Sequence, residues 1–469
     1  MTKAIWYSII GLAVLVVSSC SSPEQYELVV KGGRVMDPES GLDAVRNIGI
    51  RDGRIEAISN DWMNGDQEID ATGLIVSPGF IDLHAHGQLD EAYRLMVQDG
   101  VTSGFELEVG TADVAAWYDE RKGGQAINYG VAIGHIPVRM QVMGDTGRFL
   151  PSGPGGSKKA TLDQIFMMKS LLEEGPRQGA VAVGFGLAYT PAASTGEFES
   201  MLRIVADHGT TAHIHVRGGR KGVDEAIDGA AVTGASLHVV HANSSGGAFT
   251  SEFLQKIEMA RTLGLDVTTE AYPYEAGMTV IESALFDDWE SWDDDRFQIH
   301  QWAETGERLT RRSFARFRKQ GGGVIIHSRT EEMTRTAIAS PLTMIASDGL
   351  INDGRGHPRT SGTYAKVLGK YVREEGVLTL MEALRKMTIE PARRLESYVA
   401  VMKSKGRLEA GADADITIFD ASTVIDRSTY IDPTIPSYGI EFVLVNGVLV
   451  VDAGELVSDA KPGRAIKAH

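Results

Sequence analysis

The sequence predicts an α/β fold, in which a (β/α)8 barrel of the TIM type carries a small β-sandwich domain formed from both chain ends. Two observations favour this fold. Short apolar strands alternate with helical stretches through the middle of the chain, which is the pattern of parallel β/α units. Segments of alternating strand pattern with tight turns stand near both ends of the chain. We expect these two end segments to share one small domain.

Within each end segment, a tight turn that contains glycine is expected to connect two strands. Asp52-Gly53 and Asn446-Gly447 each separate two strand-like segments, and glycine tolerates the positive φ that tight hairpin turns need. The sequence therefore predicts one composite β domain from residues 25–77 and 400–469. Its expected strands are residues 26–30, 33–36, 46–51, 54–59, 416–420, 442–445 and 448–451.

The middle of the chain, residues 78–399, carries the pattern of the barrel. Eight strand candidates indicate a closed barrel of ordinary size. A further apolar run, residues 323–327, is assigned to an insertion at about residues 277–340, whose neighbouring residues 286–302 are rich in Asp and Trp. The eight strand candidates are residues 80–86, 101–108, 129–135, 180–187, 211–216, 236–241, 266–272 and 344–347.

The first twenty residues are typical of an exported lipoprotein. Lys3 precedes an apolar run, residues 4–17, which is too short to span a bilayer comfortably and matches the apolar region of a signal peptide. Small residues then precede Cys20, as in bacterial lipoprotein signals. We expect cleavage before a lipidated Cys20 and anchoring to a membrane, either facing the periplasm or in the outer membrane. The alternative is a transmembrane helix with an incidental cysteine.

The amino-acid composition limits the classes of partner that the protein is expected to bind. The formal net charge is -17 at pH 7, which argues against nucleic acid because phosphate binding needs clustered Lys and Arg. Hydrophobic residues make up 43% of the chain, enough for a large core. Cys20 is the only cysteine, so no disulfide can form within the chain. We expect a small-molecule partner, and contact with a membrane only through the lipid.

Candidate metal ligands stand at the ends of the predicted strands. His84 and His86 are two residues apart, so on a strand they point to the same face and can bind one metal ion together. His215, His241 and Asp348 end three later strand candidates. Because the carboxyl ends of barrel strands meet at one face, these five side chains are expected to converge.

Other histidines and two glutamates lie in the same strands. His215 and His241 are favoured over His213 and His238 because they lie nearer the strand ends, and His135 is treated as hydrogen-bonded. Glu106 and Glu108 share one face of the second strand, where two carboxylates are costly unless a cation compensates them. Glu108, nearer the carboxyl end, is the better ligand candidate.

The ordered set of motifs resembles the amidohydrolase superfamily, and within it the D-aminoacylase or N-acyl-D-amino-acid deacylase branch. The resemblance runs from about Val30 to the C-terminus. It rests on residues 78–86, 184–191, 215–217, 272–274, 347–349, 357–359, 412–416 and 461–464.

The resemblance implies roles for single residues. His84 and His86 match the first-strand metal pair, His215 and His241 match later ligands, and Asp348 matches the catalytic aspartate. These deacylases typically use a cysteine at the end of the second strand, and this chain has none there, so Glu108 is expected to replace it. Residues 180–189 offer no lysine that could become a bridging ligand. The implied cofactor is Zn²⁺, as one ion or two, with other divalent metals as alternatives.

The implied reaction is hydrolysis of an N-acyl-D-amino acid by metal-activated water, with Asp348 carrying the proton from water to the leaving amine. Arg359 and Arg217 are candidates for binding the substrate carboxylate. Tyr189 and Tyr274 are candidate hydrogen-bond donors to the same group or to the oxyanion.

Two features bear on the substrate and on the alternatives to this function. Residues 242–244 are Ala-Asn-Ser where the family tends to place a lysine, so the exact substrate is left open. A dipeptidase or a cyclic-amide hydrolase is the alternative enzyme. A non-catalytic binding lipoprotein is disfavoured because a binder has no need of Asp348.

Overall fold

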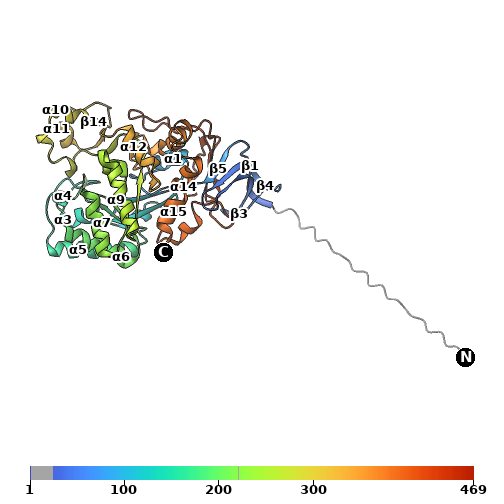
Figure 1. The fold of residues 1–469 in the computed structure, drawn as a ribbon, viewed down its shortest axis with the longest axis horizontal. Helices are drawn as coiled ribbons and strands as arrows, with labels where there is room; N and C mark the ends of the chain where they lie inside the picture. Colours follow the sequence, from blue (N-terminus) through green and yellow to red (C-terminus); the bar gives the residue numbers. More distant parts are fainter. Residues whose placement is uncertain (2–24, 220, 469) are drawn as a thin grey trace.

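The computed structural model describes Met1, residues 25–219 and residues 221–468. Cys20, the predicted lipidation site, lies outside the described residues. Across the described part of the chain, no helix is long and apolar enough to cross a membrane. Figure 1 shows the strands of the N-terminal segment at one end of the molecule and the helices around the barrel at the other.

Both chain ends build one nine-stranded sheet. Its order is β22-β21-β20-β19-β5-β1-β2-β3, with β4 beside β1. The two ends meet where β5 pairs antiparallel with β19, and Asp52 and Asn446 adopt positive φ in the predicted turns. The strands are β1 Gln25–Asp37, β2 Leu42–Arg51, β3 Arg54–Ser59, β4 Asn64–Asp70, β5 Ile75–Pro78, β19 Ile416–Phe419, β20 Ile440–Val445, β21 Val448–Asp452 and β22 Glu455–Leu456.

The eight predicted barrel strands form a second sheet with only parallel pairings, which confirms the barrel. Its order is β16-β12-β11-β10-β9-β8-β7-β6. The strands are β6 Phe80–Asp82, β7 Val101–Thr111, β8 Asn128–Gly134, β9 Val183–Gly186, β10 Thr211–His215, β11 Ser236–Val239, β12 Val267–Ala271 and β16 Thr343–Ile345.

The barrel closes through the segments that follow its first and last strands. The backbone N–H of Asp348 donates to the carbonyl of His84 at 2.7 Å, and that of His86 donates to the carbonyl of Gly349 at 2.8 Å. The N–H of Ser347 donates to a carboxylate oxygen of buried Asp82 at 3.1 Å. This closure places the predicted catalytic aspartate directly against the predicted first-strand histidines.

Helices cover the outside of the barrel, and α6 illustrates why they form. The Ser194 side chain caps the first turn by accepting from the N–H of Glu197, and Gly209 ends the helix at φ 63°. Apolar side chains of α6 face the barrel, where Phe198 packs edge-on against Phe185 of β9 at 5.5 Å. The main covering helices are α1 Asp90–Gln98, α3 His135–Met143, α5 Leu162–Arg177, α6 Thr195–His208, α7 Gly222–Thr233, α9 Thr250–Thr262, α12 Glu331–Ala339, α13 Arg359–Lys366 and α14 Leu380–Met387.

A separate subdomain is inserted between β12 and β16. It contains a three-stranded antiparallel sheet with the order β13-β15-β14 and a core of aromatic residues that includes Trp292, Trp302 and Phe314. The apolar run at residues 323–327 forms β15 in this sheet and not in the barrel. The elements are β13 Gly277–Val280, α10 Asp294–Gln298, β14 His300–Trp302, α11 Arg311–Gln320 and β15 Gly323–Ile326.

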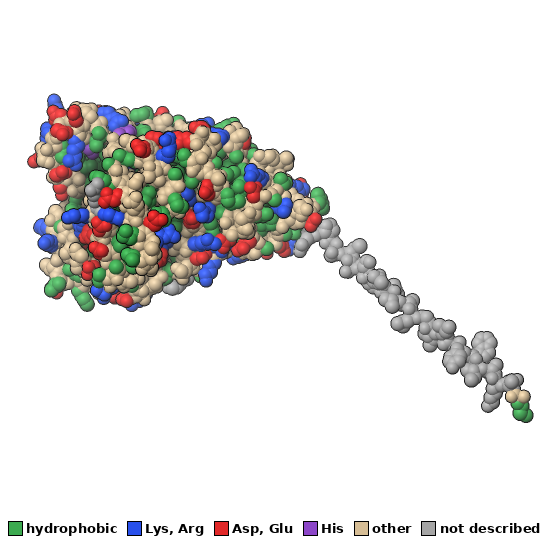
Figure 2. All heavy atoms as spheres, viewed as in Figure 1, with side chains coloured by type: hydrophobic (Ala, Val, Ile, Leu, Met, Phe, Trp, Pro, Cys, Tyr) green, Lys and Arg blue, Asp and Glu red, His purple; other side chains and the backbone are tan. Residues whose placement is uncertain are grey.

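The surface carries charges of both signs. On the face shown in Figure 2, Lys and Arg side chains are interspersed with Asp and Glu and form no continuous basic patch. The chain as a whole has a net charge of -17.

Candidate metal centre

The first group of the centre follows β6 and β16. The two rings of His84 and His86 approach through their Nε2 atoms, which are 3.0 Å apart. Oδ1 of Asp348 lies 3.4 Å from Nε2 of His84 and 3.3 Å from Nε2 of His86. Asp348 has φ 53°, an uncommon backbone conformation for a residue with a side chain and one often found at functional sites. Two histidines and one carboxylate thus face a common point.

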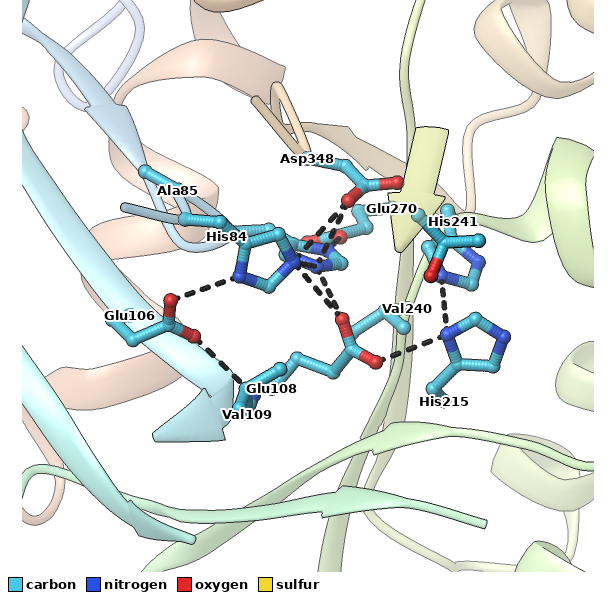
Figure 3. A network of polar contacts seen from close by, with 12 residues as sticks. His84, Ala85, Glu106, Glu108, Val109, His215, Val240, His241, Glu270 and Asp348 are labelled. Carbon is cyan, nitrogen blue, oxygen red and sulfur yellow. Dashed lines mark hydrogen bonds and ion pairs between the residues drawn. The ribbon is translucent and has the colours of Figure 1, made fainter. Parts of the chain in front are cut away.

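Glu108 of β7 connects this group with a second one. Its Oε2 lies 2.8 Å from Nε2 of His84 and its Oε1 lies 3.0 Å from Nδ1 of His215. Nε2 of His241 lies 3.1 Å from the same Nδ1. Figure 3 shows the carboxylate of Glu108 between the His84 side and the His215 side of the centre. All five predicted ligands and Asp348 are therefore brought together.

The donor set fits divalent metal ions. His84, His86, Glu108 and Asp348 offer ligand atoms within 4.8 Å of one another, and Glu108, His215 and His241 do the same. Two facing ring nitrogens at 3.0 Å satisfy each other only if one carries a proton and the other does not, whereas a cation between them would accept a lone pair from each. Imidazole with carboxylate is a suitable ligand set for zinc. Because both groups share Glu108, the centre has places for two ions.

Asp348 and Glu108, the carboxylates of the two ligand groups, have lowered pKa values and are ionised at neutral pH. Burial opposes ionisation of Asp348, but the charges of Arg359 and His84 outweigh it and hold the pKa of Asp348 well below its ordinary value. Burial likewise opposes ionisation of Glu108, but His215 and the hydrogen bonds from His84 and His86 hold its pKa well below the ordinary value. Both carboxylates can therefore bind a cation or accept a proton at neutral pH.

The histidines divide into two kinds. Burial disfavours the charged forms of His84 and His86, but the surrounding carboxylates outweigh it and raise the pKa of both rings well above the ordinary value. Burial and the neighbouring His215 lower the pKa of His241 to about 3. His241 is thus neutral, with a ring nitrogen available to a metal.

Two further carboxylates, those of Glu270 and Glu106, hold the rings of His84 and His86 in place. Nδ1 of His84 lies 2.5 Å from Oε1 of Glu270, and Nδ1 of His86 lies 2.9 Å from Oε2 of Glu106. Glu270 of β12 also contacts Nε2 of His238 at 2.8 Å. Such contacts on Nδ1 direct Nε2 toward a metal. Sequence reasoning missed Glu270, although a glutamate within the strand candidate at residues 266–272 was a usable signal.

The three histidines set aside on the sequence lie outside both ligand groups. His213 of β10 and His238 of β11 are fully buried and precede His215 and His241 in the sequence, and their ring centres are 4.7 Å apart. His135 begins α3, where its Nε2 lies 2.9 Å from a carboxylate oxygen of Glu197.

A cavity of about 370 Å³ opens onto the centre. Metal-ligand candidates line its floor, and the insertion contributes part of its wall. Of the residues predicted to bind substrate, Tyr189 lines it, and sequence reasoning missed Ser244, Tyr272 and Arg329. The lining includes Tyr189, His215, His241, Ser244, Tyr272, Gly277, Met278, Arg329 and Asp348.

The other predicted substrate residues make contacts within the protein. Nη1 of Arg359 lies 2.9 Å from Oδ2 of Asp348, and the side chain is 1% exposed. The guanidinium of Arg217 donates to the carbonyls of Pro191 and Ala193 and pairs with Glu225. The hydroxyl of Tyr274 donates to Asp426 at 3.1 Å. These contacts give Arg359 a direct place beside Asp348 and hold Arg217 and Tyr274 among residues outside the cavity lining.

Comparison with known proteins agrees with this geometry. The model of the amidohydrolase family matches residues 156–451. An N-acyl-D-glutamate deacylase from Alcaligenes xylosoxydans xylosoxydans is 31% identical over 95% of this chain and 97% of that protein. A D-aminoacylase from the same organism is 29% identical over 92% of this chain and 96% of that protein.

Comparison with solved structures also finds similarity to deacylases. The N-acyl-D-glutamate deacylase from Bordetella bronchiseptica, complexed with zinc and a phosphonate inhibitor that mimics the tetrahedral intermediate, superposes with a TM-score of 0.81. It is 28% identical, and the match covers 95% of this chain and all of that chain. A D-aminoacylase described as having a binuclear metal centre has a TM-score of 0.80 at 25% identity, over 94% of this chain and all of that one. The chain therefore belongs to the amidohydrolase family, in its D-aminoacylase branch, and is a metal-dependent hydrolase of carbon-nitrogen bonds other than peptide bonds.

Proposed function

We propose that the protein hydrolyses the amide bond of N-acyl-D-amino acids. The observation that carries this proposal is the position of Glu108, which joins two groups of candidate metal ligands, and three members of these groups, His215, His241 and Asp348, line a cavity of about 370 Å³. A cavity of this size suits a small N-acylated amino acid. The relatives named as deacylases of N-acyl-D-glutamate and N-acyl-D-aspartate support this substrate class.

His84, His86, Glu108, His215 and His241 would hold the metal. A bound divalent ion supplies an activated water and polarises the acyl carbonyl. Asp348 faces the same point, is ionised, and has Arg359 to fix its orientation. In this position the carboxylate of Asp348 accepts the proton of the attacking water and returns it to the departing amine. Without that proton, the amine is a poor leaving group.

Tyr189 is placed to stabilise the developing oxyanion. Its ring contacts that of His215 edge-on at 4.7 Å, and its hydroxyl borders the cavity beside Thr279. Burial, with the nearby charge of Glu108, raises the pKa of Tyr189 well above its ordinary value. The hydroxyl therefore keeps its proton and can donate a hydrogen bond to the oxyanion.

A substrate panel tests the proposal. Zinc-loaded protein should release acetate from N-acetyl-D-leucine or N-acetyl-D-glutamate and should not act on the L-enantiomers. Glu108→Gln should lower metal content and turnover together. Turnover of cyclic amides or dipeptides, with none of the N-acyl-D-amino acids, would assign another substrate class to the same centre.

We also propose that the mature protein is exported and held at a membrane by lipid on Cys20. The support is the pattern of residues 4–20, a short apolar run followed by small residues and the cysteine. The folded part described here begins at Gln25, so only a few residues would separate the lipid from the nine-stranded sheet.

A further inference from the structure

A second cavity, of about 840 Å³, lies beside the metal centre. Gly87, the neighbour of the metal-ligand candidate His86, lines this larger cavity, and so does Phe149. The ring of Phe149 meets the ring of His86 edge-on, with ring centres 5.4 Å apart. The larger cavity is therefore next to the centre on the side of His86, whereas His215 and His241 line the smaller cavity of about 370 Å³.

The two cavities share part of their wall. Met278 of β13 lines both of them, and Val280, two residues further on, lines the larger one. Phe149 and Val280 also pack against the apolar cluster that contains Tyr189, which lines the smaller cavity. Because the ring of Phe149 contacts His86 and borders the larger cavity, it stands between the two.

The loop that carries Phe149 is fixed by one carboxylate. The two oxygens of Asp145 accept hydrogen bonds from four backbone N–H groups of residues 147–155, at distances of 2.7 to 3.2 Å. Leu150, the residue after Phe149, is 2% exposed and belongs to the same buried cluster as Tyr189. Phe149 is therefore held from both sides, and its ring is a fixed wall.

The chemistry of the amide places the two halves of the substrate on different sides of the centre. In the proposed reaction Asp348, which lines the smaller cavity, protonates the departing nitrogen. The amino-acid half is bonded to this nitrogen and therefore occupies the smaller cavity. The acyl half is bonded to the other side of the carbonyl carbon, so it points away from that cavity, toward His86 and Phe149.

Beyond Phe149, the larger cavity offers apolar surroundings for an alkyl chain. The cations Arg148, Lys319 and Arg355 that border it are exposed to solvent. An alkyl chain is stabilised when it leaves water for apolar surroundings, but the ring of Phe149 lies across its path. The apolar side chains in the lining include Met278, Val280, Ala303, Leu350 and Ile351.

We propose that Phe149 limits the length of the acyl group that the enzyme accepts. Short acyl groups such as acetyl fit between the metal centre and the ring, and the ring blocks longer chains from the larger cavity. This inference rests on the proposed deacylase function. It makes Phe149 a residue that determines acyl specificity, and Asp145 the residue that positions its loop.

The first test compares substrates that differ only in the acyl chain. We measure kcat/KM for N-acetyl-D-leucine and N-octanoyl-D-leucine with the zinc-loaded wild type, Phe149→Ala and Phe149→Tyr. Leu89→Ala is the matched control, because Leu89 lines the same larger cavity at the start of α1, is 48% exposed and lies outside the loop of Phe149. Zinc content is measured for every variant.

Phe149→Ala should raise the ratio of kcat/KM for the octanoyl substrate to that for the acetyl substrate by about 10- to 100-fold, a discrimination that a few methylene groups in an apolar pocket can provide. Phe149→Tyr keeps the ring and should keep the wild-type ratio, as should Leu89→Ala. An unchanged ratio in Phe149→Ala, an equal change in Leu89→Ala, or a wild type that already prefers the octanoyl substrate would overturn the proposal.

A binding measurement tests the role of Phe149 independently of turnover. Acetohydroxamate and octanohydroxamate, which bind zinc through the hydroxamate group, are titrated calorimetrically into zinc-loaded wild type and Phe149→Ala. Octanohydroxamate should bind the variant at least about tenfold more tightly than wild type, and acetohydroxamate should bind both alike.

The two measurements separate the two proposals. If the wild type hydrolyses neither leucine derivative, the deacylase function fails, while the hydroxamates still decide the role of Phe149. Equal affinity of octanohydroxamate for the two proteins, or binding to neither, would show that Phe149 does not control access to the larger cavity.

Discussion

The contact between Glu270 and His84 leads to a quantitative prediction for metal affinity. Glu270 is 1% exposed, and its two oxygens lie 2.5 Å from Nδ1 of His84 and 2.8 Å from Nε2 of His238. Nearby His84 and the hydrogen bond from His238 hold the pKa of Glu270 well below its ordinary value despite burial. An ionised acceptor on Nδ1 makes His84 a better metal ligand and fixes its ring.

Glu270→Gln keeps the shape of the side chain but removes its charge. The amide oxygen can still accept from His84, and His238 can change tautomer by donating from Nδ1 to the hydroxyl of Thr268, 2.8 Å away. The main loss is the difference between a charged and a neutral hydrogen bond, about 1 to 1.5 kcal/mol. That difference is roughly a tenfold loss of zinc affinity, the lower end of the range for such outer contacts.

Competition with a chelator of known affinity measures the zinc dissociation constant of each variant. Glu197→Gln is the matched control, because Glu197 is equally buried and contacts a histidine, His135, outside the centre. The reasoning is refuted if Glu270→Gln binds zinc as tightly as wild type, or if the control loses as much affinity.

Three other variants test separate parts of the structure. Asp348→Asn should keep its metal but lose turnover by on the order of 10²- to 10⁴-fold, and wild-type turnover at full occupancy would move the proton transfer to another residue. Cys20→Ser should release the protein from membranes or trap its precursor, as fractionation will show; a processed variant that stays in the membrane fraction contradicts the lipid anchor. His300 is buried against Trp292, and burial lowers its pKa to about 4. Between about pH 6.5 and pH 4 the imidazole of His300 is therefore protonated only in the unfolded chain. The free energy of unfolding that is present above this window falls by about 3 kcal/mol as the pH decreases through it. Denaturant unfolding at pH 7.5 and 4.5 should show a smaller loss for His300→Phe than for wild type, and equal losses would exclude His300 as the source.

The barrel was predictable because its signals are local. Each strand is a short apolar run next to a helical stretch, and the order of such runs along the chain is the order of neighbours in the sheet. The convergence of His84, His86, Glu108, His215 and His241 follows from the same rule, since the carboxyl ends of barrel strands meet at one face. The two-residue side-chain period of a strand and the position near a strand end therefore predicted that these side chains lie close together, whereas their roles as ligands stay a prediction.

The contacts that could not be predicted from the sequence are those between residues far apart in the chain. The contact between Glu270 and His84 joins residues 186 positions apart, and no spacing pattern marks it. Arg217 and Arg329 are both arginines in loops near glycine or serine, yet one donates to backbone carbonyls and the other faces the cavity. That distinction follows from how the insertion folds over the barrel, which only tertiary packing determines.

The joining of the two chain ends in one sheet has a consequence for biosynthesis. Ser77 of β5 donates to the carbonyl of Thr417 of β19, a separation of 340 residues. During translation, β5 therefore leaves the ribosome with the edge that pairs with β19 unpaired. This edge stays unpaired until nearly the whole barrel and then β19 have been synthesised. Such late pairing slows folding and leaves an aggregation-prone edge exposed. The nine-stranded sheet is therefore expected to complete its pairing only after residues 416–419 have been made.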